Sequence, residues 1–398
     1  MDSILFFSKM MYYNNEQVID MKLKRWHLYF IATLCFLLAF SALNFKYDKF
    51  FRVNGINNDN RALIEMYLDD NEQEYLIENG IAVSEFIDYI EYDEFHLQYY
   101  QYYNLLRKAK KYNDLTVLLT DANSIADRLT VEFGNGADER FETLVKYDLE
   151  YAYLNSTYFD FGNIRYYQLL RTLYNEGDYS YIVLTNTYVN IMDEENVSSR
   201  YDKFKDMVAT YNATGVNILL TSQLPQGTER LYTFDPLTTV INSQTFIANC
   251  QPKHMTMIEK IPRMSYSMYL EKEAAQAFKS MYDAMPSTVK KKMILTKGYI
   301  GYDVLNLESP SLAGYSEFQL GNSISIKEQG ISEDQFESTQ TYQWLIEHSY
   351  EYGFVLRYPA DKVDITQQKS ATIFRYVGTE IAKTLHDNHQ CLEEYSKE

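Results

Sequence analysis

Cysteine, proline and glycine are all scarce in this chain of 398 residues, which carries 3 Cys, 7 Pro and 15 Gly. Three cysteines cannot build a disulfide framework, and the absence of a Cys-x-x-Cys spacing excludes a thiolate zinc site. Cys35 lies in an apolar run, which leaves Cys250 and Cys391 either paired outside the cell or present as free or buried thiols. Neither G-x-G-x-x-G nor G-x-x-x-x-G-K-S/T occurs, so a nucleotide-binding fold has no support.

Basic residues are also in the minority, with 37 Lys and Arg against 55 Asp and Glu and a formal net charge of -18. Phosphate binding needs a basic face, so nucleic acid is a poor candidate partner. The hydrophobic fraction of 46% is typical of a globular protein, and the length suffices for two domains of ordinary size.

The segment from Trp26 to Phe45 contains no Asp, Glu, Lys or Arg and is long enough to cross a bilayer as a helix. Basic residues stand just before it, so the positive-inside rule places residues 1–25 in the cytoplasm and the remainder outside. We therefore predict a single-pass cell-membrane anchor over residues 26–45. The alternative is a cleaved signal peptide that starts at Met21, which gives the same extracytoplasmic compartment.

Residues 46–231 are predicted to form a mixed helical and β region that serves as a spacer or a partner-binding module. The stretch from Asn57 to Lys111 carries apolar residues at helical spacing. Three later segments, 114–121, 179–192 and 216–222, are rich in β-branched residues and are predicted as strands. No repeat of fixed period is apparent in the sequence.

The C-terminal region, residues 232–398, carries four motifs in order: AGYSEFQLGNSISI from Ala313, WLIEHSYEYGFVLRYP from Trp344, FRYVG from Phe374 and LEEY from Leu392. Together they resemble the VanY-type D-alanyl-D-alanine carboxypeptidases, which are zinc peptidases that trim peptidoglycan stem peptides. The resemblance implies a domain with a small antiparallel sheet flanked by helices. The predicted fold class is therefore α+β, with an N-terminal transmembrane helix, the mixed middle region and this domain.

The positions at which the family holds its zinc are substituted. The family pattern S-x-H-x-x-G-x-A-x-D stands at residues 316–325, with Phe318 at the histidine and Ser325 at the aspartate. The pattern E-P-W-H stands at residues 370–373, with Ser370 at the general base and Ile373 at the last histidine. Phe and Ile offer no lone pair, a neutral Ser is a weak ligand, and a hydroxyl is no general base near neutral pH.

The arginine that the family is expected to aim at the substrate carboxylate is replaced by Ile300. We therefore predict that zinc is absent and that no catalytic residue remains. A residual peptide-binding groove is predicted from the positions that the resemblance keeps, which are Tyr299, Ser316, Gln319, Arg357, Tyr358 and Arg375.

These observations predict a membrane-anchored cell-envelope pseudoenzyme that binds a peptidoglycan stem peptide or a partner protein. The alternative is an active metallocarboxypeptidase with a relocated metal site. His386 and His389 are three residues apart, with Glu393 and Glu394 one turn on, a spacing that can hold zinc if the segment is helical. The same spacing is typical of a solvated, charged helix.

Overall fold

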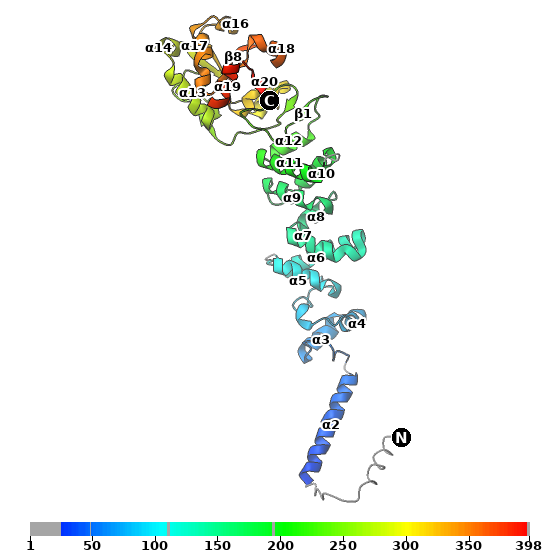
Figure 1. Ribbon diagram of the computed structural model, residues 1–398. Coiled ribbons are helices and arrows are strands. Elements are labelled where there is room, and N and C mark those ends of the chain that lie inside the picture. Colours follow the sequence, from blue (N-terminus) through cyan, green and yellow to red (C-terminus); the bar gives the residue numbers. More distant parts are fainter. Residues whose placement is uncertain (1–24, 48, 110–111, 193–195, 396–398) are drawn as a thin grey trace, which may run out of the picture. The chain divides into compact units, whose positions relative to one another are not determined.

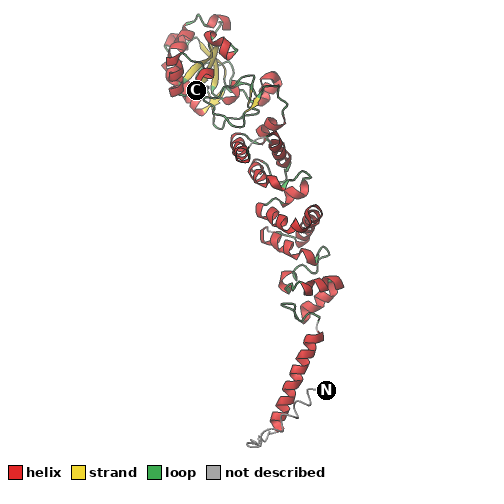
Figure 2. Ribbon diagram, turned by 45° about the vertical axis from the view of Figure 1, so that its right-hand side comes forward, coloured by secondary structure: helices red, strands yellow, loops and turns green. Residues whose placement is uncertain are grey.

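The computed structural model describes residues 25–47, 49–109, 112–192 and 196–395 (Figure 1). Strands gather in the C-terminal part of the chain, and helices make up most of the remainder (Figure 2). The chain divides into two compact units, Met1–Lys146 and Tyr147–Glu398, which are described separately. The predicted domain border at 231/232 lies inside the second unit and stays a prediction.

The first helix, α2 (Arg25–Tyr47), contains the predicted anchor. Its segment Arg25–Leu43 has a mean hydropathy of 1.8, and none of it is buried against the protein. Large apolar side chains such as Phe30, Phe36 and Leu38 are more than half exposed. By length and composition, α2 therefore meets the requirements of a membrane span or of a signal sequence.

The rest of the first unit consists of helices and connecting turns, with no strand among its described residues. Its helices are α3 (Asn58–Tyr67), α4 (Asp70–Glu78), α5 (Tyr100–Ala109), α6 (Leu115–Phe133) and α7 (Ala137–Tyr147), with 3-10 turns η1 (Val83–Glu85), η2 (Leu97–Tyr99) and η3 (Gly134–Gly136). Two of them begin with capping boxes, in which the Asn57 and Asp69 side chains accept backbone N–H groups and are reciprocated by Asn60 and Glu72.

The strand predicted at residues 114–121 is wrong, because this segment forms the start of α6. Asp114 caps the helix by accepting a hydrogen bond from the Thr116 amide. Leu118, Ala122 and Ile125 recur at steps of three and four residues and are fully buried. The helical period of these core positions outweighs the β-branched residues among them.

The second unit begins with further helices, α8 (Glu150–Asn155), α9 (Ile164–Leu170), α10 (Ser180–Ile191), α11 (Val197–Thr210) and α12 (Ala213–Thr221), with 3-10 turns η4 (Phe161–Asn163) and η5 (Arg171–Leu173). The strands predicted at 179–192 and 216–222 are therefore also wrong. In α10 the buried positions Tyr181, Leu184 and Tyr188 follow the helical period. Asn212 caps α12 through the Gly215 amide, which starts a helix where composition alone favours a strand.

A buried tyrosine fixes the turn before α5 in the first unit. The Tyr103 hydroxyl accepts a hydrogen bond from the His96 amide, seven residues earlier, at 3.1 Å. It donates to Asn123 Oδ1 on α6 at 2.6 Å, and the Asn123 amide donates to the Glu94 carbonyl at 2.7 Å. The two side chains thus join α5, α6 and the preceding loop by three hydrogen bonds.

The same arrangement occurs in the second unit around Tyr167. Its hydroxyl accepts from the Asp160 amide, again seven residues earlier, at 3.1 Å and donates to Asn186 Oδ1 on α10 at 2.8 Å. The Asn186 amide donates to the Tyr158 carbonyl at 2.6 Å. The tyrosine and asparagine are separated by 20 residues in the first case and 19 in the second, so the two arrangements differ by one residue in this spacing.

The C-terminal part of the second unit contains an antiparallel four-stranded sheet in the order β5-β6-β8-β7. The strands are β5 (Met293–Lys297), β6 (Ser323–Glu328), β7 (Phe354–Tyr358) and β8 (Ser370–Tyr376). Two smaller pairs precede it, parallel β1 (Glu229–Arg230) with β2 (Thr245–Phe246) and antiparallel β3 (Met255–Met257) with β4 (Tyr269–Glu271). The predicted α+β class with a small antiparallel sheet is confirmed.

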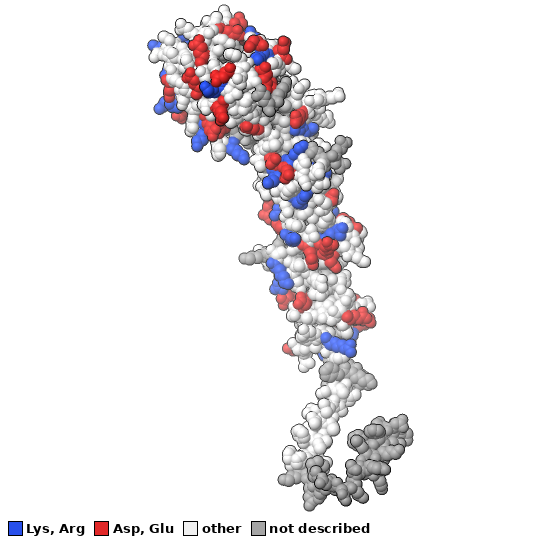
Figure 3. Space-filling model, viewed as in Figure 1, with Lys and Arg blue, Asp and Glu red and all other residues white. Residues whose placement is uncertain are grey.

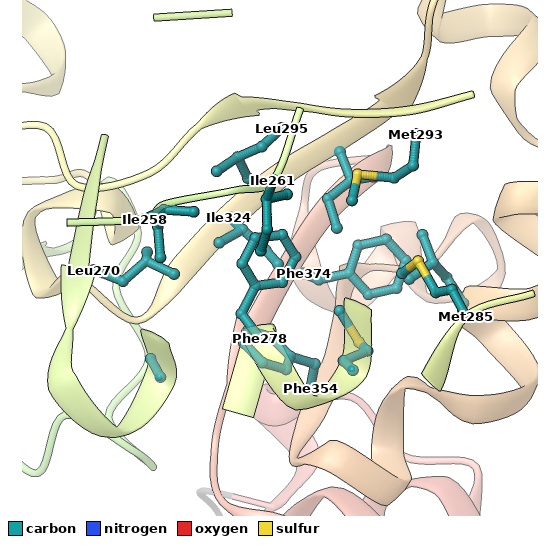
Figure 4. Close-up of a cluster of buried hydrophobic side chains, with 14 of the residues drawn as sticks. Ile258, Ile261, Leu270, Phe278, Met285, Met293, Leu295, Ile324, Phe354 and Phe374 are labelled. Carbon is teal, nitrogen blue, oxygen red and sulfur yellow. The ribbon is translucent and has the colours of Figure 1, made fainter. Parts of the chain in front are cut away.

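The remaining helices surround this sheet: α13 (Lys272–Ala284), α14 (Ser287–Lys290), α15 (Tyr302–Glu308), α16 (Glu333–Phe336), α17 (Gln340–His348), α18 (Val363–Thr366), α19 (Thr379–Asn388) and α20 (Leu392–Tyr395), with 3-10 turns η6 (Pro310–Leu312), η7 (Glu317–Leu320), η8 (Ser349–Tyr352) and η9 (Ala360–Lys362). One face of the sheet packs on α13, where Phe278 meets Ile324, Phe354 and Phe374 in a core that excludes water (Figure 4).

The cysteines of the second unit are free. Cys250 is 6% exposed and Cys391 is 3% exposed, and both are unpaired thiols. Of the two alternatives left open by the sequence, the structure therefore shows buried thiols rather than a disulfide.

Candidate functional site

The positions at which the resemblance implies zinc ligands come together at the centre of the sheet. Ser325 on β6 pairs with Ile373 on β8 on one side and with Lys297 on β5 on the other. The backbone of Phe318 lies close by, because its carbonyl accepts a hydrogen bond from the Ile300 amide at 3.2 Å. Residues far apart in sequence are thus assembled into one site.

Phe318 takes its place through the turn η7. Its amide donates to the Ser316 hydroxyl, and the turn ends at Gly321 in the left-handed conformation with φ of 72°. A Cβ at Gly321 would approach the Glu271 amide nitrogen to 3.1 Å, so glycine is required for both conformation and space. The Phe318 ring is 8% exposed and lies under the Lys297 ammonium, which is 5.7 Å from the ring centroid.

A row of hydroxyl groups occupies the same part of the sheet, and we call Thr296, Ser325, Thr372 and Ser370 the hydroxyl row. The Thr296 hydroxyl donates to Ser325 Oγ at 2.9 Å, and Ser325 Oγ donates to Thr372 Oγ1 at 3.3 Å. Thr372 and Ser370 hydroxyls are 3.2 Å apart, and Glu333 accepts from Thr372 at 3.3 Å. The hydroxyls therefore satisfy one another.

These residues do not fit a zinc ion. Phe318 and Ile373 offer no donor atom, and the Ser325 hydroxyl is already bonded to its two neighbours in the hydroxyl row. Among the described residues there is no group of three or more His, Cys, Asp and Glu side chains placed to hold a metal. Ser370, at the position of the base, carries a hydroxyl that shares its hydrogen bonds with Thr372.

The two histidines considered for a relocated metal site do not share a helical face. α19 ends at Asn388, and His389 adopts the left-handed conformation with φ of 54° as its C-cap. The His386 ring stacks on Tyr350, with centroids 3.7 Å apart, and its Nδ1 lies 3.2 Å from Asp387. Glu393 is engaged elsewhere, by two hydrogen bonds from Arg357. The prediction that His386 and His389 lie on one face of a helix, on which the relocated metal site depended, is therefore wrong.

A buried ion cluster of Glu317, Arg357, Arg375 and Glu393 lies beside the site. Glu317 accepts from Arg357 Nε and lies 3.2 Å from Arg375 Nη1, while Arg357 Nη1 reaches both oxygens of Glu393 at 2.8 and 2.9 Å. Both arginine side chains are fully buried. Two positive and two negative groups balance one another, as burial requires.

The pKa values of the two arginines move in opposite directions. Burial lowers the pKa of Arg375, and the nearby Glu317 carboxylate only partly compensates. Burial also opposes the charge on Arg357, but Glu317 and Glu393 outweigh it and its pKa rises. Arg375 additionally donates to the Pro236 carbonyl at 2.8 Å, which ties the segment before β2 to β8.

Most of the residues predicted to line a residual peptide groove are buried in the structure. Gln319 is fully buried and bonded to the Gly314 amide and the Ala248 carbonyl, and Ser316 caps η7. Arg357, Tyr358 and Arg375 are at most 5% exposed. Tyr299 is the partly exposed member of the set, and its own contact with a peptide stays a prediction.

Sequence reasoning missed three contributors to the site. Thr296 and Glu333 lie in segments without a motif, and only the fold brings them to the hydroxyl row. Thr372 lies two residues after Ser370, so the two-residue period of a strand places both on one face of β8 and could have revealed the pair.

Comparison with known proteins places these motifs in a family. A family model for VanY, D-alanyl-D-alanine carboxypeptidase, matches residues 301–379. The chain is 31% identical over 199 residues to the putative carboxypeptidase YodJ of Bacillus subtilis. The match covers 42% of this chain and 70% of that protein. It is 30% identical over 151 residues to a D-alanyl-D-alanine carboxypeptidase of Enterococcus faecium, which covers 36% of this chain and 49% of that protein.

Solved structures of peptidases also match part of this chain. The LdcB LD-carboxypeptidase is 28% identical with a TM-score of 0.38, covering 44% of this chain and 92% of that chain. The vancomycin resistance D,D-pentapeptidase VanY from the VanB-type cassette, solved with Zn(II), is 24% identical with a TM-score of 0.30, covering 40% and 99%. The match to YodJ over most of its length, together with the family model, shows that this chain belongs to the VanY-type D-alanyl-D-alanine carboxypeptidase family.

Proposed function

We propose that this protein is a membrane-tethered, non-catalytic member of the family, with α2 as a retained single-pass anchor and the C-terminal domain outside the cell. In this role the domain binds a peptidoglycan stem peptide or an envelope protein without cleaving it. The observation that carries the proposal is the pairing of Ser325 with Ile373 beside Phe318, because three ligand positions are assembled but present no metal-binding set.

The chemistry of the hydroxyl row supports the loss of catalysis. Peptide hydrolysis by this family's route needs a water activated by zinc and a carboxylate base. Here the base position holds Ser370, whose hydroxyl is hydrogen-bonded to Thr372. A nearby carboxylate, Glu333, is exposed and accepts a hydrogen bond from Thr372, so it is joined to Ser370 only through the Thr372 hydroxyl.

Lys297 supports the retention of peptide binding. Its ammonium is exposed above the Phe318 ring, and it carries no ion pair within the part of the chain that the structure describes. A stem peptide ends in a carboxylate, and an ammonium can receive it as a point charge where Ile300 cannot. Acidic and basic side chains are interspersed over the visible face of the domain (Figure 3).

The test uses the full chain in detergent, with the E. faecium D-alanyl-D-alanine carboxypeptidase as the positive control. We expect zinc far below one per chain and no release of D-alanine from a peptide that ends in D-Ala-D-Ala, under conditions in which the control turns over. Stoichiometric zinc with D-alanine release would refute the proposal. Calorimetric titration with the same peptide, on wild type and Lys297→Met, decides between a stem peptide and an envelope protein as the ligand.

A further inference from the structure

A second candidate binding site lies along the free edge of the sheet. β7 is the last strand in the order β5-β6-β8-β7 and pairs with β8 on one side. A pocket of about 370 Å³ is lined by three consecutive β7 residues, Phe354, Val355 and Leu356. Because successive side chains of a strand point to opposite faces, one pocket can contact all three only where it meets the strand edge-on. We call this pocket the β7 groove.

Helices on the two faces of the sheet form the walls of the β7 groove. Tyr342 and Ile346 of α17 line one wall, and Leu385 and His386 of α19 line the other. Leu356 packs toward the main core while Val355 packs toward the α19 side, which agrees with one wall on each face. Ile346 is 37% exposed, so apolar surface is open to a ligand at this edge.

The backbone of Leu356 points into the groove. The Val377 amide donates to the Gly353 carbonyl, which sets the phase of the β7–β8 ladder. In an antiparallel ladder alternate residues face the partner strand, so Gly353 and Val355 face β8 and Leu356 faces away. Within the described ranges, no hydrogen bond is seen to the outward N–H and C=O of Leu356. These groups are those with which an added strand would pair.

The negative charge of Asp361 restricts the kind of ligand that the β7 groove can bind. Asp361 lines the groove and is exposed, and it has no ion pair with any described residue, whereas its neighbour Lys362 is paired to Glu394 at 2.9 Å. Burial and the carboxylates of Glu337 and Asp361 raise the pKa of Tyr342, which agrees with a negative local field. A basic side chain is the natural complement of this end.

We propose that the β7 groove binds an extended segment of a partner protein, which adds to β7 as a strand, directs its side chains alternately toward α17 and α19, and sets a Lys or Arg against Asp361. Strand addition of this kind takes its affinity from main-chain hydrogen bonds and its specificity from pockets for alternate side chains. A second copy of this chain, with its formal net charge of -18, is a poorer match for the unpaired Asp361.

This site goes beyond the proposed function and is independent of it. None of the residues that line the groove belongs to the hydroxyl row or to the substituted ligand positions. Zinc content, peptidase activity and stem-peptide binding therefore do not decide whether a ligand binds in the β7 groove.

The experiment titrates the full chain in detergent with a library of capped hexapeptides. Each peptide has Lys at one end, threonine at alternate positions and Val, Ile, Leu or Phe between them. We expect the best members to bind wild type, and Ile346→Asp to weaken that binding by about tenfold or more, since an apolar contact with the ligand is lost. The matched control Ile365→Asp, at an equally exposed isoleucine outside the groove, should change binding by less than about twofold.

Backbone methylation of the peptide tests the strand pairing itself. Two forms of the best binder are N-methylated at odd or at even positions. They differ only in which edge of the peptide strand can donate hydrogen bonds. One form should bind and the other should not. If Ile346→Asp fails to fold, Asp361→Asn replaces it, and it should weaken the Lys-bearing peptide but not its norleucine analogue. Equal binding of both methylated forms, no binding by any library member, or a β7-mediated dimer in sedimentation would overturn the inference.

Discussion

Ser325 and Ile373 are paired directly across β6 and β8, so two positions at which the resemblance implies zinc ligands face each other with a hydroxyl and an aliphatic side chain. The sheet that should present a metal site is intact at this point. A serine hydroxyl stands at position 325, where the family pattern has an aspartate. The neighbouring hydroxyls of Thr296 and Thr372 are hydrogen-bonded to it. Under the proposed function, these substitutions remove metal binding while the pairing of β6 with β8 stays in place.

Restoring the ligands should restore the metal. We expect the variant that combines Phe318→His, Ser325→Asp and Ile373→His to bind about one zinc per chain, because three protein ligands complete a site with one open position. Phe318→His alone should bind none, since one imidazole is not a site. Elemental analysis of the purified full chain after dialysis against zinc measures both. A triple variant that folds but stays free of zinc would contradict the assignment of these positions.

Glu317 should be the most costly single charge to remove from the buried ion cluster. Glu317→Ala leaves Arg357 and Arg375 without their shared carboxylate while both remain buried. We expect a loss of about 3–5 kcal/mol in the free energy of unfolding, the range for a broken buried ion pair. Urea unfolding followed by Trp344 fluorescence in a Trp26→Phe background measures it.

The control for that variant is a surface ion pair. Lys279 and Asp283 lie 2.5 Å apart on α13 with both side chains more than half exposed. Lys279→Ala should cost at most about 1 kcal/mol, because solvent screens such a pair. If Glu317→Ala costs no more than Lys279→Ala, the ion cluster is not the structural element described here.

The sequence was a good guide to the C-terminal domain and a poor one to the helices before it. Gly321 lies at a turn, and Arg357 and Arg375 lie in buried ion pairs. Few residue types fit such positions, so the sequence motifs that contain them are informative. In α6 and α10, by contrast, the local β-branched composition conflicts with a helical spacing of core positions, and packing decides the outcome. Partners separated by long stretches, such as Thr296 and Ser325, are set by topology and not by local pattern.

The repeated tyrosines should each stabilise their own unit. Tyr103→Phe removes the acceptor of the His96 amide and the donor to Asn123, and Tyr167→Phe does the same for Asp160 and Asn186. Each should cost about 0.5–1.5 kcal/mol, the net contribution of a typical intramolecular hydrogen bond. Hydrogen exchange should accelerate at the His96 amide in the first variant and at the Asp160 amide in the second.

Tyr266→Phe is the matched control for both tyrosine variants, because the Tyr266 side chain is 86% exposed. Its effect on stability should stay within about 0.5 kcal/mol. A Tyr103→Phe protein with unchanged exchange at His96 would show that the repeated hydrogen bonds do not hold the loop.

Alkaline pH should destabilise the second unit through its buried thiols. Burial raises the pKa of the Cys250 thiol from about 9 to about 12, and that of Cys391 to about 11. Between the pKa of a thiol in the unfolded chain and its raised pKa in the folded chain, the unfolded chain loses the proton while the folded chain keeps it. The unfolded state then binds fewer protons, so stability falls as pH rises. The loss due to Cys250 should begin near pH 9, continue toward pH 12 and amount to about 1.4 kcal/mol for each pH unit. Urea unfolding at pH 7, 9 and 10, on wild type and Cys250→Ala, measures it. The variant should show a shallower fall, and equal slopes would place the Cys250 thiol in contact with water.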